Sequence, residues 1–130
     1  MKRLVVATCL VLSSGPAYGE WLLVVSNDTE GVTVYADPNT VRRKGDLVKM
    51  WTLFDFKTTQ SVGDISCLSS KGQDEYDCAE ERIRQLALTT FSSHMGQGKV
   101  VHSDADAEEW APVSPNSVGK LLWDLACGKP

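Results

Sequence analysis

The stretch that decides the fold reads Lys71-Gly72-Gln73-Asp74-Glu75-Tyr76-Asp77-Cys78 and continues, after a short polar turn, into Arg82-Ile83-Arg84-Gln85-Leu86-Ala87-Leu88. Cys78 lies directly before the second, mixed polar and apolar segment, and Cys127 ends a short helix-like piece near the C-terminus. A bond between these two cysteines would fix the last element of the chain to its middle. The stretch contains no recognisable catalytic nucleophile, metal-ligand set or phosphate-binding loop, so it indicates architecture more than activity.

Cys67, Cys78 and Cys127 allow three pairings, each with one thiol left over. Closing Cys78 to Cys127 is worth about 4 kcal/mol in the chain-entropy account, and closing Cys67 to Cys78 about 3 kcal/mol, so these energies do not choose. We favour Cys78–Cys127, because a short terminal helix is marginal by itself and needs an anchor. Cys67 lies between Ser66 and Leu68, where a small buried thiol is ordinary.

The segment after Cys78 is compatible with two structures. Its apolar residues Ile83, Leu86, Ala87 and Phe91 would form one stripe of a helix. Thr89-Thr90-Phe91 favours a strand instead, and residues 95–98 followed by 99–102 have the pattern of a hairpin return. We therefore predict a strand here.

Upstream of this segment the pattern is that of β-strands. Residues 21–26 and 32–36 predict a first hairpin that stops at 37–39, followed by a brief strand at 40–43. Residues 47–56 form the longest β-run and carry large apolar groups on both sides, which predicts a central strand. We expect a polar loop at 57–64 and a modest strand at 65–70.

Downstream, an acidic surface segment at 103–109 precedes a short helix. Asn116 or Ser117 can cap this helix, its apolar stripe is Val118, Leu121, Leu122 and Leu125, and Gly128 is a suitable stop. The sequence thus predicts an α+β fold. It consists mainly of an antiparallel β-sheet of about six strands, with a C-terminal α-helix tethered by the disulfide between Cys78 and Cys127.

The N-terminus has the pattern of a signal peptide. Met1-Lys2-Arg3 is basic, residues 4–12 are apolar, and Ala17-Tyr18-Gly19 offers small residues for cleavage after Gly19. We predict a signal peptide at 1–19 and one domain at 20–130. The apolar run is far shorter than the roughly 20 residues of a membrane span, so we expect no transmembrane segment in the mature chain. Cys9 lies inside the apolar run and not at its end, which argues against lipidation.

The formal net charge of −4 becomes −6 once Lys2 and Arg3 leave with the signal peptide. This sign argues against a general binder of nucleic acid or of anionic membranes. Arg42, Arg43 and Lys44, with Lys49 near them, form the one basic cluster. We predict it as a possible docking site for an anionic partner, although a solvated turn between strands would explain it equally well.

Candidate chemistry is weak. Ser92, His94 and Asp104 contain the residue types of a hydrolase, but no Gly-x-Ser-x-Gly elbow accompanies them. The run from His102 to Glu109 invites interpretation as a calcium site, but counting from Asp104 the sixth and twelfth positions are Glu109 and Pro115, where a helix-loop-helix calcium site needs glycine and glutamate. The four tryptophans suit a sugar-stacking surface, yet in a small domain we expect them in or beside the core. We predict no enzyme, no cofactor and no metal site.

Several segments, in this order and spacing, resemble the surface-adhesin protein E family of Gram-negative bacteria over essentially the whole mature chain. They are Glu20-Trp21, Val34-Tyr35-Ala36-Asp37-Pro38, Val41-Arg42-Arg43-Lys44-Gly45-Asp46-Leu47-Val48-Lys49-Met50-Trp51, Glu75-Tyr76-Asp77-Cys78, Met95-Gly96-Gln97-Gly98-Lys99-Val100-Val101, Trp110-Ala111-Pro112-Val113 and Leu122-Trp123-Asp124-Leu125-Ala126-Cys127. The resemblance implies a mostly antiparallel sheet, a C-terminal helix tethered by a disulfide, and a strand after Cys78.

The resemblance also implies a non-enzymatic surface protein whose best-known members bind host extracellular-matrix or serum proteins. We therefore expect an exported binding module with a protein partner, either from the host or from the envelope, located in the periplasm or at the cell surface. The alternative is a periplasmic accessory protein, such as a small inhibitor or partner of an envelope enzyme. The missing lipidation signal motivates this alternative.

Overall fold

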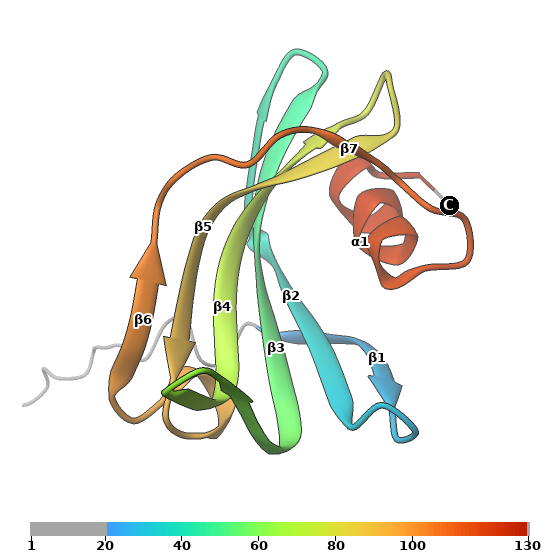
Figure 1. Cartoon of the computed structure of the whole chain (residues 1–130). Coiled ribbons are helices and arrows are strands. Elements are labelled where there is room, and N and C mark those ends of the chain that lie inside the picture. Colours follow the sequence, from blue (N-terminus) through green and yellow to red (C-terminus); the bar gives the residue numbers. More distant parts are fainter. Residues whose placement is uncertain (1–20, 130) are drawn as a thin grey trace, which may run out of the picture.

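One antiparallel sheet dominates the structure, a computed structural model that describes residues 21–129 (Figure 1). The strands are β1 (Leu22–Asn27), β2 (Val32–Lys44), β3 (Leu47–Val62), β4 (Ile65–Asp77), β5 (Arg82–Phe91), β6 (Val100–Asp104) and β7 (Ala111–Pro112). The first six lie side by side in sequence order, and β7 pairs with β5. A 3-10 turn, η3 (His94–Gly96), precedes β6, and α1 (Val118–Cys127) ends the fold. The predicted fold class and the strand after Cys78 are confirmed; the predicted signal peptide lies outside the described residues.

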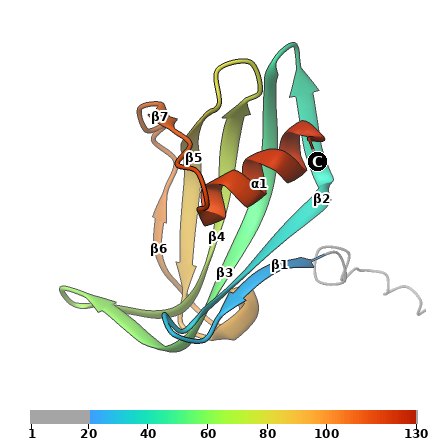
Figure 2. The same ribbon diagram turned by 90° about the vertical axis from the view of Figure 1, so that its right-hand side faces the viewer.

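The helix α1 covers one side of the sheet, here called the helix face, and leaves the other side, the open face, uncovered by α1 (Figure 2). Alternate residues of β3 such as Val48 and Met50 point to the helix face, because successive side chains of a strand point to opposite sides. The core beneath α1 consists of Val34, Ala36, Val48, Met50, Tyr76, Leu122, Trp123, Ala126 and Cys127. With β2 on one side and β4 on the other, β3 is the central strand that its two apolar faces predicted.

The predicted stop at residues 37–39 was wrong, because β2 continues through Pro38 to Lys44. The register shifts between Asp37 and Arg42, so the chain forms a bulge there. The Thr40 hydroxyl accepts a hydrogen bond from the Trp51 backbone N–H at 2.9 Å and donates one to the Asp37 carbonyl at 2.6 Å. This side chain replaces the lost backbone pairing and carries the strand past the proline.

The polar loop predicted at 57–64 was also wrong, and β4 is longer than the strand predicted at 65–70. β3 continues to Val62, and β4 extends from Ile65 to Asp77, with a register shift between Asp55 and Gln60. Beyond that shift the two strands form a hairpin arm that projects from the sheet (Figure 2). An arm with water on both sides tolerates polar residues on both faces, so the polar composition of 57–61 was misleading.

The terminal helix has the caps that its sequence predicts. Of the two candidate caps, Ser117 is the one used, and its hydroxyl accepts from the Lys120 N–H at 3.1 Å. Gly128 follows the helix with φ at 72°, a left-handed conformation in which a side chain would be strained. Its N–H turns back to the last carbonyls of the helix, at Asp124 and Leu125.

Candidate functional site

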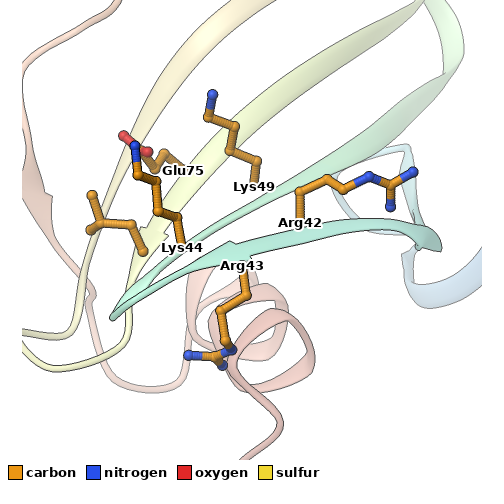
Figure 3. A pocket seen from close by; sticks show the side chains of 6 residues that line it. Arg42, Arg43, Lys44, Lys49 and Glu75 are labelled. Atoms are coloured by element: carbon orange, nitrogen blue, oxygen red, sulfur yellow. The ribbon is translucent and has the colours of Figure 1, made fainter.

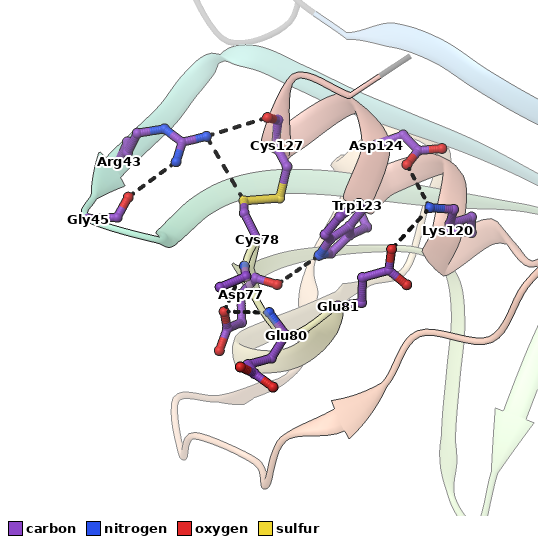
Figure 4. Close-up of a disulfide and its surroundings, with 11 residues drawn as sticks. Arg43, Gly45, Asp77, Cys78, Glu80, Glu81, Lys120, Trp123, Asp124 and Cys127 are labelled. Carbon is purple, nitrogen blue, oxygen red and sulfur yellow. Dashed lines mark hydrogen bonds and ion pairs between the residues drawn. A yellow bond between two sulfur atoms is a disulfide. The ribbon is translucent and has the colours of Figure 1, made fainter.

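A disulfide joins the end of β4 to the end of α1, as predicted (Figure 4). It links Cys78 to Cys127 with the two Cα atoms 5.7 Å apart, and Cys67 is the free thiol of the described chain. Next to the disulfide, the indole N–H of Trp123 donates to the Asp77 carbonyl at 2.9 Å. The helix is therefore held on the sheet by a covalent bond, a buried hydrogen bond and its apolar stripe.

The structure divides the predicted basic cluster between the two faces of the sheet (Figure 3). Arg43 points to the helix face, where its guanidinium donates to the Cys127 carbonyl at 3.4 Å and lies 3.9 Å from the Cys78 sulfur. It also donates to the Gly45 carbonyl at 3.1 Å. Arg43 is thus a support of the disulfide, while Arg42 and Lys44 lie on the open face.

Strand register extends the open-face part of this cluster across four strands. One row consists of Arg42, Lys49, Glu75 and Arg84, and the row beside it of Lys44, Leu47, Asp77 and Arg82. Directly opposed side chains on one face lie close enough to interact, so the rows form one charged surface. We call these eight residues the charged face. Sequence reasoning missed Glu75, Arg82 and Arg84, because only the register brings them beside the cluster.

The two carboxylates of the charged face are already paired. Arg84 donates to Glu75 at 2.8 and 2.9 Å, and Arg82 donates to Asp77 at 2.9 Å. Burial favours the neutral form of Asp77, but the hydrogen bonds from Arg82 and from two backbone N–H groups, together with the Arg82 charge, outweigh it. The net result is a pKa for Asp77 below its usual value, so the carboxylate stays ionised and bound to Arg82.

The remaining cations of the charged face are Arg42, Lys44 and Lys49. Within residues 21–129, none of these three forms an ion pair with a carboxylate. They border an open hollow of about 470 Å³ whose lining consists of Arg42, Arg43, Lys44, Leu47, Lys49 and Glu75. This part of an acidic protein is therefore locally positive.

Aromatic side chains flank the charged face. The Trp110 ring lies 4.7 Å from the Arg82 guanidinium and 4.6 Å from that of Arg84, a cation–π arrangement. Trp21 and Trp51 line a second hollow of about 310 Å³ together with Asp37, Thr40 and Lys71. Trp123 is in the core, as expected, while the other three tryptophans are half-buried.

The weak catalytic candidates do not converge. Ser92 accepts from the Lys99 N–H at 2.8 Å, and the carboxylate of Asp104 accepts from the Asp106 N–H at 2.8 Å. His94 lies 3.3 Å from Asp55, a residue that the sequence did not suggest. Across the part of the chain that the structure describes, no three or more His, Cys, Asp or Glu side chains gather in a way that could hold a metal ion.

The fold and this surface define a class: a small antiparallel β-domain with a disulfide-tethered terminal helix and a charged open sheet face. Residues 21–128 match the family model described as surface-adhesin protein E. The chain belongs to the surface-adhesin protein E family.

Solved structures with the same fold include protein E of Haemophilus influenzae. A second crystal form of that protein matches with a TM-score of 0.66 and 13% sequence identity, over 84% of this chain and 87% of that one. Protein E from non-typeable Haemophilus influenzae matches with a TM-score of 0.59 and 15% identity, over 82% and 72% of the two chains. A comparison with curated protein sequences gives no significant match.

Among residues 21–129, no helix is both long and apolar enough to cross a membrane.

Proposed function

We propose that this protein is an exported binding module that holds an acidic segment of a protein partner against its charged face. The observation that carries the proposal is that Arg42, Lys44 and Lys49 line one open hollow without a carboxylate counter-ion in the described chain. These cations act at contact range, where they can hold the carboxylates of a short anionic segment. Membership of a surface-adhesin family supports binding as the activity.

The geometry favours an acidic polypeptide. Arg42 and Lys49 lie opposite each other on the neighbouring strands β2 and β3, and Lys44 lies on the next row, so an extended segment that crosses these two strands passes over all three. Trp51 follows Lys49 by two positions on the same face of β3; it lines the second hollow and offers apolar contact area there. The acidic net charge of the whole chain opposes the long-range attraction that a nucleic-acid backbone requires.

The test is binding of fluorescein-labelled decaglutamate, followed by fluorescence anisotropy at low and physiological salt. We expect the double variant Lys44→Glu and Lys49→Glu to bind about tenfold more weakly than the parent, since each lost ion pair costs about 1 kcal/mol or less. The matched control is Lys57→Glu with Lys99→Glu, which makes the same charge change at two exposed lysines away from the hollow. Equal losses in both variants, or no binding by the parent, would overturn the proposal.

We further infer that the mature protein reaches the cell surface. The predicted signal peptide at residues 1–19 and the surface-adhesin family support this inference. Labelling of intact, unpermeabilised cells with an antibody to the domain checks it, and we expect labelling without permeabilisation. Signal only after the outer membrane is opened would favour the periplasmic accessory protein instead.

A further inference from the structure

A further pocket, distinct from the two hollows described above, lies on the helix face beside the region that α1 covers. It has a volume of about 220 Å³ and is lined by Thr52, Phe54, Ser70, Gly72, Asp74, Gln85 and Leu88. Register places these residues together, since Thr52 pairs with Gly72 and Gly72 with Leu88. Pockets for drug-sized ligands usually measure roughly 300–1,000 Å³, so this one suits a smaller group, such as a short chain.

Gly72 keeps the floor of this pocket open. A Cβ atom at this position would lie 3.3 Å from the Ala87 carbonyl oxygen, 3.6 Å from the Leu88 Cδ1 and 3.9 Å from the Gln85 Oε1. Any side chain at position 72 would therefore enter the space that Leu88 and Gln85 border. Gly72 lies inside β4, where a glycine usually weakens a strand, and no turn requires it there. Its position coincides instead with the opening of the pocket.

Asp74 gives the pocket its charge. Asp74 is half-buried, and within residues 21–129 it forms no ion pair with a lysine, arginine or histidine. The hydroxyl of fully buried Tyr76 lies beside it without forming a hydrogen bond of good geometry. Burial raises the pKa of Asp74 to about 6; the Tyr76 hydroxyl opposes this rise and the charge of Glu108 adds to it. A partly buried carboxylate that lines a pocket and has no counter-ion is an incomplete ion pair.

The rest of the pocket suits the cation that would complete this pair. Glu108 adds a second negative charge and is held in place by Gln85. The backbone carbonyl of Gln85 accepts a hydrogen bond from the Glu108 N–H at 2.9 Å, and the Gln85 side-chain amide donates one to the Glu108 carboxylate at 3.5 Å. Phe54 and Leu88 provide apolar walls, and Thr52 and Ser70 provide hydroxyl oxygens. An ammonium group donates three hydrogen bonds and needs an apolar wall for its methylene chain.

We propose that this pocket binds a primary alkylammonium group, with the carboxylate of Asp74 as its counter-ion. The ligand is either a free short amine or the end of a lysine side chain that belongs to a partner. The site is on the opposite side of the sheet from the charged face and takes the opposite charge. It therefore stands independently of the acidic segment proposed above.

The test uses pentylamine, with pentanol as a neutral probe of the same length, in a titration followed by 1H–15N NMR of the mature domain at pH 7.5. We expect pentylamine to shift amide signals around Gly72, Asp74, Gln85 and Leu88, and pentanol to leave them unchanged. Asp74→Asn should weaken pentylamine binding at least about tenfold, because hydrogen bonds to charged groups contribute more than 1 kcal/mol. Gly72→Ala should weaken it too, since the new methyl enters the pocket.

Asp106→Asn, which removes an exposed carboxyl elsewhere, is the matched control and should bind like the parent. A parent-like NMR spectrum of Asp74→Asn establishes that the variant is folded. Equal binding of pentanol, unchanged binding by Asp74→Asn, or no shifts with pentylamine would overturn the proposal. Nα-acetyl-lysine methylamide separates the two ligand sources: if it binds like pentylamine, the site accepts a lysine of a partner, and if only pentylamine binds, the ligand is a free amine.

Discussion

At the scale of single residues, the sheet contains carboxyl groups in contrasting environments. Asp77 has a guanidinium and two backbone N–H groups around it, which lower its pKa. Asp74, three residues earlier in β4 and on the other face, has burial and a second carboxylate around it, which raise its pKa to about 6. The pKa values of two aspartates three positions apart in one strand are thus shifted in opposite directions.

The raised pKa of Asp74 predicts that the free energy of unfolding depends on pH. In the unfolded chain this group ionises near its ordinary pKa of 3.8, so between about pH 4 and 6 the folded state holds the extra proton. The free energy of unfolding should therefore fall as the pH rises through this window, by about 3 kcal/mol at most, since residual exposure screens the charge. Asp74→Asn should lack this loss and be the more stable protein at pH 7.

Urea unfolding of the parent and of Asp74→Asn at a series of pH values from 4 to 8 measures this effect. Asp77 and the other carboxyl groups contribute equally to both proteins, so the difference between the two curves isolates Asp74. A difference that does not change with pH would show that Asp74 ionises normally in the folded state.

At the scale of elements, the helix α1 depends on the sheet for its existence. A helix of ten residues is marginal in water, and four of its side chains are buried against the sheet. The apolar stripe and the cap at Ser117 were visible in the sequence, because helix periodicity and capping are local signals. The support from Arg43 was not, because its carbonyl and sulfur partners come from distant parts of the chain.

Removal of the disulfide tests the dependence of α1 on its anchor. The bond spans 49 positions, so the variant Cys78→Ala with Cys127→Ala should lose about 4 kcal/mol of the free energy of unfolding. Urea unfolding followed by circular dichroism measures the loss, and the fluorescence of buried Trp123 reports whether the helix still docks. Cys67→Ala is the control and should change little. A loss below about 1 kcal/mol would show that packing alone holds the helix.

At the scale of the whole molecule, the sheet divides into a supported body and an unsupported arm. In the body, β3 and β4 have neighbours on both sides, with α1 on one face and η3 attached through Asp55 and Ser69. Beyond the register shift at Asp55 and Gln60, the arm consists of these two strands. Residues near its tip, such as Thr59 and Ser61, are exposed.

Amide hydrogen exchange should follow this division. We expect the slowest exchange at the fully buried Met50 and Leu53, and exchange that is faster by orders of magnitude at Thr59 and Ser61 in the arm, because local opening there breaks few contacts. Exchange measured by NMR, residue by residue, checks this. Similar protection along the whole of β3 would mean that the arm is stabilised by contacts that the fold does not explain.

The molecule also shows where sequence reasoning stops. Alternation predicted a central β3, and cysteine placement predicted the correct disulfide. The arm was missed because a polar hairpin has no buried face to produce a pattern. Of the charged face, the sequence indicated Arg42, Lys44 and the nearby Lys49, while Arg43 of the same cluster lies on the other face; the remaining members join through register between strands. The Asp74 pocket gave no signal at all, because its glycine, hydroxyl groups and carboxyl are unremarkable until the strands pair.

The order of the cysteines has a consequence for biosynthesis. A chain that enters an oxidising compartment N-terminus first exposes Cys67 and Cys78 together, well before Cys127 emerges. An oxidant that acts before Cys127 emerges can join only Cys67 to Cys78, and a chain in that pairing reaches the native bond by thiol–disulfide exchange. For such chains, maturation needs disulfide isomerisation as well as oxidation.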